Sequence, residues 1–132
     1  MAWLELDSPT VTAGGTIRGT VVIVNDTGST ITSVCGSPYV AVVETPYGLQ
    51  STSRLAVCSP PQSMPVGESR WPIVALAKYE LCSEPATTTR PPCQADHTPP
   101  PIPTGTTRVV VMLDQMVPRG FPVPEPVSIT ID

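Results

Sequence analysis

Alternating apolar and polar positions predict a chain built from short β-strands. The central segment is Thr16–Val24, which lies between turns at Gly14-Gly15 and Asn25–Gly28. One face carries Ile17, Gly19, Val21 and Ile23, and the other carries Arg18, Thr20, Val22 and Val24. Both faces become apolar toward the C-terminal end, which predicts that the middle of this strand is covered on two sides. This strand and the strand that follows the second turn form a predicted hairpin. A hairpin of this kind is not stable alone and needs a second sheet.

The same alternation recurs at intervals along the chain. The further predicted strands are Trp3–Leu6, Thr30–Val34, Pro38–Glu44, Ser53–Cys58, Thr106–Leu113 and Val127–Ile131. Thr45–Gly48 has proline second and glycine fourth, which predicts a type I turn. About eight short strands between turn signals predict an all-β chain, an antiparallel β-sandwich forming one domain over residues 1–132.

The segment Arg70–Leu81 fits either a helix or a strand. Ala75–Leu81 contains good helix formers. However, Trp71 begins an alternating series that continues to Tyr79, and Pro72 disfavours a helix interior. We favour the strand, with Trp71 as a core anchor.

Composition supports strands and excludes two classes of partner. The 18 prolines oppose long helices, and the low aromatic content of 5% leaves valine and isoleucine to fill the core. A formal net charge of −4, with only 14% charged residues, argues against nucleic-acid binding and against electrostatic docking on anionic lipid. No apolar run approaches the ~20 residues of a membrane span.

Four cysteines in a small strand-rich chain predict two disulfides and an oxidising compartment. Their separations of 23, 24 and 11 positions contain no closely spaced pair of the kind found in zinc sites. We favour Cys82–Cys93, which closes a local loop, and by elimination Cys35–Cys58. The pairings Cys35–Cys93 with Cys58–Cys82, and Cys35–Cys82 with Cys58–Cys93, remain open.

One long proline-rich loop, Cys82–Gly105, holds seven of the 18 prolines and the single histidine. Loops beyond about 12–15 residues are usually functional or disordered. Together with Ser59–Gly67 it forms the predicted contact surface, because proline-stiffened loops lose less entropy on binding. The candidate interaction residues are Arg90, His97, Pro100 and Ile102 in the first loop and Met64 in the second.

The sequence offers little support for catalysis. His97 follows Asp96 in a proline-rich loop, and no G-x-S-x-G nucleophile motif is present. Metal binding by Asp96, His97 and Glu84 is disfavoured, because loop flexibility weakens such a site. We therefore predict no catalytic residue, no metal and no cofactor.

Two N-terminal features bear on export. Asn25-Asp26-Thr27 matches the N-glycosylation acceptor pattern, but a turn is the favoured interpretation. Met1-Ala2-Trp3 leads straight into a strand without a basic or apolar leader region. We expect an excised mature domain whose only contact with a membrane is through a segment outside this chain.

The run PTVTAGGTIRGTVVIVNDTG (Pro9–Gly28) resembles a recurrent opening of bacterial extracellular immunoglobulin-like domains. The later runs also resemble secreted actinobacterial domains of unassigned function. They are MPVGESRWPIV (Met64–Val74), KYELC (Lys78–Cys82), PPC (Pro91–Cys93), PPPIPTGT (Pro99–Thr106) and PEPVSITI (Pro124–Ile131). The layout is similar, more weakly, to Ig-like intracellular proteinase inhibitors of bacilli. The resemblance implies an Ig-like sandwich of about seven or eight strands, and its structural motifs carry over no catalytic residues.

Together these features predict a non-enzymatic interaction module that is secreted, periplasmic or on the cell surface. It would serve as the sensor or accessory domain of a cell-envelope protein. The expected partner is another envelope protein or a domain of the same parent chain. The alternative is a protease inhibitor that presents Met64–Pro65 or Arg90–Pro91 as a substrate mimic.

Overall fold

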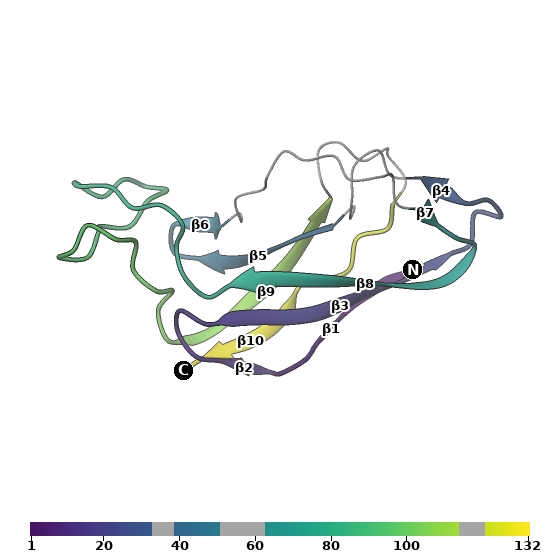
Figure 1. The fold of residues 1–132 in the computed structure, drawn as a ribbon, viewed down its shortest axis with the longest axis horizontal. Helices are drawn as coiled ribbons and strands as arrows, with labels where there is room; N and C mark the ends of the chain where they lie inside the picture. Colours follow the sequence, from purple (N-terminus) through teal and green to yellow (C-terminus); the bar gives the residue numbers. More distant parts are fainter. Residues whose placement is uncertain (33–38, 51–62, 114–120) are drawn as a thin grey trace.

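The computed structural model describes residues 1–32, 39–50, 63–113 and 121–132. In these ranges the chain contains ten β-strands and no helix, which confirms the all-β prediction (Figure 1). The predicted strand Ser53–Cys58 lies outside the described residues. So do Cys35 and Cys58, and their pairing stays a prediction. Within the described ranges there is no candidate membrane-spanning helix.

The first sheet has three antiparallel strands in the order β1–β3–β8. They are β1 (Ala2–Leu6), β3 (Thr16–Asn25) and β8 (Gly67–Leu76). Strand β3 lies in the middle and pairs with β8 along its whole length, from Thr16 opposite Leu76 to Asn25 opposite Gly67. The ambiguous segment that begins at Arg70 is therefore a strand as far as Leu76, as favoured from its alternation.

The second sheet has five strands in the order β2–β10–β9–β5–β6. They are β2 (Thr10–Val11), β10 (Val127–Ile131), β9 (Gly105–Leu113), β5 (Tyr39–Thr45) and β6 (Gly48–Gln50). Strand β2 is parallel to β10, and the other pairs are antiparallel. A tight turn joins β5 to β6, with Thr45 opposite Gly48, which has a φ of 95°. A separate two-stranded ribbon pairs β4 (Ile31–Thr32) with β7 (Ser63–Met64).

The two sheets share one hydrophobic core. Its members include Ile17, Val21 and Ile23 of β3, Trp71 and Ile73 of β8, Ala41 and Val43 of β5, Val109 and Val111 of β9, and Ile129 and Ile131 of β10. A cluster drawn from both sheets requires that their buried faces pack against each other. Trp71 is 8% exposed and confirms its predicted role as a core anchor.

The middle of β3 is also covered on its outer face. Val22 is fully buried although it points away from the core shared by the sheets. Trp3 and Arg70 lie directly opposite it on the two neighbouring strands. Both donate hydrogen bonds to the carboxylate of Glu5, at 3.0 and 3.2 Å, which holds these long side chains over Val22. The predicted cover on two sides is thus confirmed.

The turn after β3 is organised by Asn25, which is 4% exposed. Its Oδ1 accepts hydrogen bonds from the backbone N–H and the hydroxyl of Thr27, at 3.1 and 2.7 Å. Its Nδ2 donates to the carbonyl oxygens of Ser29, Met64 and Pro65, at 2.9, 3.2 and 3.2 Å. The side-chain amide is therefore fully used inside the protein, which confirms the turn interpretation and leaves no accessible nitrogen for a glycan.

Gly19 allows the close approach of β1 and β3. A Cβ at this position would lie 2.7 Å from the carbonyl oxygen of Glu5 and 3.2 Å from Leu6 Cδ2. Gly19→Ala is therefore expected to destabilise the fold by about 1–3 kcal/mol, the usual effect of overpacking. Urea unfolding measures this, with Thr20→Ala in the same strand as the control. An unchanged midpoint for Gly19→Ala would contradict the close approach.

Candidate functional site

Residues 77–104 form the β8–β9 connection, which extends beyond the sheets at one end of the molecule (Figure 1). Its base is joined to the core. Tyr79 donates its N–H to the carbonyl of Pro100 at 3.1 Å, and Ile102 donates to the carbonyl of Ala77 at 3.0 Å. The side chains of Ala77, Tyr79 and Ile102 are all buried. Both ends of the connection are therefore fixed to the core of the protein.

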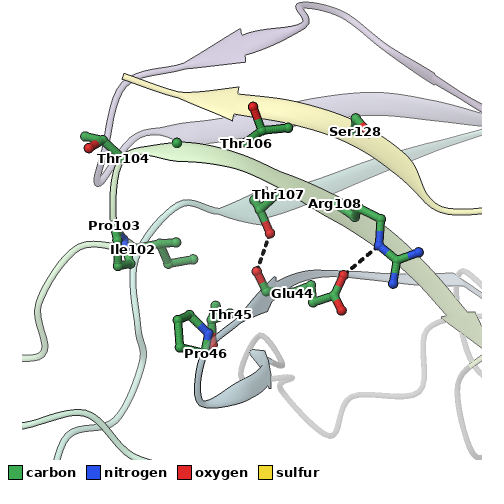
Figure 2. Close-up of a pocket in the computed structure, with 11 residues that line it drawn as sticks. Glu44, Thr45, Pro46, Ile102, Pro103, Thr104, Thr106, Thr107, Arg108 and Ser128 are labelled. Carbon is green, nitrogen blue, oxygen red and sulfur yellow. Dashed lines mark hydrogen bonds and ion pairs between the residues drawn. The ribbon is translucent and has the colours of Figure 1, made fainter.

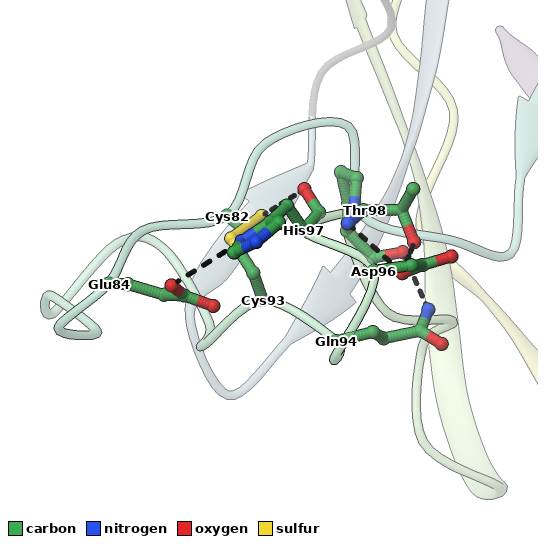
Figure 3. Close-up of a disulfide and its surroundings, with 8 residues drawn as sticks. Cys82, Glu84, Cys93, Gln94, Asp96, His97 and Thr98 are labelled. Atoms are coloured by element: carbon green, nitrogen blue, oxygen red, sulfur yellow. Dashed lines mark hydrogen bonds and ion pairs between the residues drawn. A yellow bond between two sulfur atoms is a disulfide. The ribbon is translucent and has the colours of Figure 1, made fainter.

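A disulfide closes the first part of the connection (Figure 3). Cys82 and Cys93 are bonded, with their Cα atoms 5.0 Å apart, which confirms the favoured pairing. Beside it, the N–H of Ser83 donates to the carbonyl of Pro91 at 3.0 Å. We call residues 83–92, which the disulfide closes, the first arm.

The tip of the first arm is a hydrogen-bonded turn. The N–H of Thr87 donates to the carbonyl of Arg90 at 3.0 Å, and the N–H of Arg90 donates back to Thr87 Oγ1 at 3.0 Å. Thr88, Thr89 and Arg90 are exposed around this turn. The tip thus presents accessible side chains from a backbone that is already ordered.

Residues 94–99 form the second arm, a compact turn. The backbone N–H of Gln94 donates to the carbonyl of Thr98, and the carbonyl of Gln94 accepts from the N–H of His97, each at 2.9 Å. The Nε2 of Gln94 donates to the carbonyl of Pro99 at 2.9 Å. Asp96 Oδ1 accepts from the N–H and the hydroxyl of Thr98, at 3.2 and 2.5 Å. These hydrogen bonds hold the pKa of the Asp96 carboxyl below its ordinary value. His97 has a φ of 65° in this turn, and its side chain is exposed.

The two arms meet at His97 and Glu84, whose Nδ1 and Oε2 atoms are 3.7 Å apart (Figure 3). The side chains are 81% and 52% exposed, so this contact contributes little to stability. Asp96 is directed toward Thr98 instead and does not join them. Among the described residues, no group of three or more His, Cys, Asp or Glu side chains is placed to hold a metal ion.

The predicted interaction residues divide into two groups. Arg90 and His97 are exposed on the two arms, and Pro100 is half-buried at the base. Ile102 and Met64 were predicted as accessible contact residues, and this is wrong, because their side chains are 2% and 0% exposed. Residues 59–62 of the second predicted loop lie outside the described residues. Ile102 is turned into the core by its backbone pairing with Ala77, and Met64 lies in β7. Neither side chain is accessible to a partner.

Sequence reasoning missed a groove beside the connection (Figure 2). This cavity of about 430 Å³ is lined by Glu44, Thr45, Pro46, Ile102, Pro103, Thr104, Gly105, Thr106, Thr107, Arg108 and Ser128. It lies between the β5–β6 turn and the start of β9, and it adjoins the last residues of the connection. Its signal in the sequence is weak, because it consists only of one acidic residue, Glu44, in the apolar strand β5 and one basic residue, Arg108, in β9.

Two charged side chains define the electrostatics of the groove. Arg108 Nε donates to Glu44 Oε2 at 2.6 Å. This hydrogen bond lowers the pKa of the Glu44 carboxyl and raises the pKa of the Arg108 guanidinium, so both groups stay ionised at neutral pH.

The hydrogen bonds of Thr98 to Asp96 allow a pH test of the second arm. Thr98→Val removes the hydroxyl donor, so the pKa of the Asp96 carboxyl is expected to rise toward its ordinary value. A lowered carboxyl pKa stabilises the turn above the unfolded-state pKa, and this support is lost as the pH falls through the folded-state pKa. An NMR titration of the Asp96 side-chain carbon measures the shift, with Thr88→Val as the control. An unchanged midpoint would contradict the assigned contact.

No family model, curated protein or solved structure matches this chain. What bears on function is therefore the geometry of the β8–β9 connection and of the groove beside it.

Proposed function

We propose that this chain is an immunoglobulin-like, extracytoplasmic interaction module that binds a partner protein through its β8–β9 connection. The strand orders support this proposal. The order β1–β3–β8 is that of strands A–B–E in immunoglobulin sandwiches, and β10–β9–β5–β6 is that of strands G–F–C–C′, with β2 added beside β10. The inter-sheet disulfide of antibody domains has no counterpart in Cys82–Cys93, which lies within one connection.

The Cys82–Cys93 disulfide supports an extracytoplasmic location, because disulfides persist in oxidising compartments and are rare in the cytosol. A secreted, periplasmic or cell-surface domain of a bacterial, actinobacterial envelope protein fits this chemistry and the resemblance of the sequence. The partner is then another envelope protein or a domain of the same parent chain. We propose no catalytic role and no cofactor, and membrane contact only through a segment outside this chain.

The observation that carries the binding proposal is the ordering of the two arms. A disulfide closes the first arm, and backbone hydrogen bonds hold both arms in defined turns. Arg90 and His97 are displayed from them, and Leu81 beside the disulfide is 55% exposed. An ordered loop loses less conformational entropy on binding, and an exposed leucine supplies an apolar anchor beside polar contacts.

A protease inhibitor remains the second candidate, because Arg90 is exposed on a constrained tip. The Met64–Pro65 site is no longer available, since Met64 is fully buried. At Arg90–Pro91 the proline is buried, which leaves little of the scissile region accessible and favours the binding module. Inhibition of a trypsin-like protease that is lost in Arg90→Ala would favour the inhibitor instead.

Affinity capture from the envelope fraction of the source organism tests the binding proposal. The baits are the unaltered chain, the Arg90→Ala/His97→Ala variant, and a matched control, Thr16→Ala/Arg18→Ala, on the exposed side of β3. Circular dichroism checks that all three fold. We expect proteins enriched by the unaltered chain and the control to be lost by the arm variant. Equal capture by all three, or no specific capture, would contradict the proposal.

A further inference from the structure

The groove beside the connection contains the guanidinium of Arg108, only part of which is hydrogen-bonded within the described residues. Arg108 lies on β9, where Ser128 of β10 is its partner on one side and the pairing with β5 ends at the next residue, Val109. Its Nε is hydrogen-bonded to Glu44, whereas in the described part of the chain its η nitrogens have no acceptor. The side chain is 53% exposed. A guanidinium has five N–H donors in a fixed plane, so most of them remain available.

The contact with Glu44 also fixes the orientation of those donors. Because Nε donates to Glu44 at 2.6 Å, the pair of η nitrogens is left as the free edge of the guanidinium among the described residues. Two parallel N–H groups on such an edge match the two oxygens of a carboxylate. A lysine at this position would offer a point charge without this geometry.

The walls of the groove indicate what else the ligand must present. The hydroxyls of Thr104, Thr106 and Ser128 can both donate and accept, which suits the amide groups of a peptide. Pro46 and Pro103 add apolar ring surface. Glu44 cancels the charge of Arg108 and the whole chain carries a formal charge of −4, so a polyanion is disfavoured.

We propose that this groove binds an extended peptide segment of the partner that carries one carboxylate, held by the η nitrogens of Arg108. This inference rests on the proposed function, because it names the chemistry that the partner brings to the surface beside the connection. The carboxylate comes either from an acidic side chain or from a chain terminus, and the shared chemistry is a single carboxylate on an extended backbone.

NMR titration of the ¹⁵N-labelled protein, followed at the Arg108 Nε–Hε signal, tests the inference. Three pentapeptides are compared: a blocked peptide with central glutamate, the same peptide with central glutamine, and the glutamine peptide with a free C-terminal carboxylate. We expect one or both carboxylate peptides to bind about tenfold or more tightly than the blocked glutamine peptide, as a charged hydrogen bond allows. Which of the two binds identifies the source of the carboxylate.

Two variants make the test specific to the groove. Arg108→Lys is expected to weaken binding about tenfold, because the two parallel N–H donors of the guanidinium are lost while the positive charge remains. Arg70→Lys is the matched control, since Arg70 is also paired with a glutamate, Glu5, and is 55% exposed. The inference would be overturned if the blocked glutamine peptide bound as tightly as the carboxylate peptides. It would also be overturned if Arg108→Lys left binding unchanged, or if Arg70→Lys weakened binding as much as Arg108→Lys. If Arg90→Ala/His97→Ala abolishes partner capture but Arg108→Lys does not affect it, this inference fails and the proposed function stands.

Discussion

Replacing Asn25 by aspartate is expected to destabilise the fold by about 3–5 kcal/mol at neutral pH, the usual effect of an uncompensated buried charge. The amide Nδ2 is 2.9–3.2 Å from the carbonyl oxygens of Ser29, Met64 and Pro65, and the residue is 4% exposed. Aspartate would put an oxygen where the donor stands, so one carboxylate would face three acceptors. The turn after β3 and its attachment to β7 would both be lost.

The sign of the pH dependence tests the same assignment. The buried carboxyl of Asn25→Asp has its folded-state pKa raised above its unfolded-state pKa, because burial and the facing carbonyls disfavour the charge. The free energy of unfolding of the variant is therefore closest to that of the unaltered protein below the unfolded-state pKa. It decreases as the pH rises through the folded-state pKa. Urea unfolding of both proteins across acid and neutral pH measures the difference. The exposed neighbour Asp26→Asn is the control, and equal midpoints for Asn25→Asp and the unaltered chain would refute the role of the amide.

Removing the disulfide in a Cys82→Ala/Cys93→Ala variant is the second large effect. The bond joins residues 11 positions apart, and in the chain-entropy account a loop of this size contributes about 3 kcal/mol. Because the base of the connection is buried with Ala77, Tyr79 and Ile102, part of this loss is expected in global stability. The midpoint of thermal unfolding is expected to fall by about 10 °C.

Hydrogen exchange locates this effect within the chain. The N–H groups of Ser83 and Thr87 donate within the first arm, and they are expected to lose protection in the double variant. Amides of β3 in the centre of the first sheet are expected to keep theirs. Retained protection at Ser83 and Thr87 would mean that hydrogen bonds alone hold the arm, and that the disulfide does not order it.

The regular part of the fold could be predicted because strands have a period of two residues. The inward series of β3, β8 and β10 follow from alternation alone, and Trp71 joins one of them. Ile102 and Met64 carry no such signal, because prolines surround them and hide any period. Their burial depends on pairing with Ala77 and Ile31, which are far away in the sequence. The proline-rich composition of these segments therefore gave no indication of which side chains return to the core.

The sites that depend on the register of strand pairing could not be predicted from the sequence. Glu44 and Arg108 are 64 positions apart, and only the pairing of β5 with β9 brings them together. The same is true of Asn25, whose local pattern predicts a turn but not the carbonyls of Met64 and Pro65, about 40 positions away. In contrast, Cys82–Cys93 was favoured because a short loop is easily closed.

Site-specific photo-cross-linking tests most directly whether the β8–β9 connection is the binding surface. A benzophenone side chain is placed at Thr89, on the tip of the first arm, and in a matched protein at Thr16, on the exposed side of β3. Each is irradiated with the envelope fraction of the source organism. The account predicts a discrete cross-linked protein from position 89, lost in the Cys82→Ala/Cys93→Ala background, and none from position 16. A cross-link that forms only from position 16, or equally from both, would contradict it.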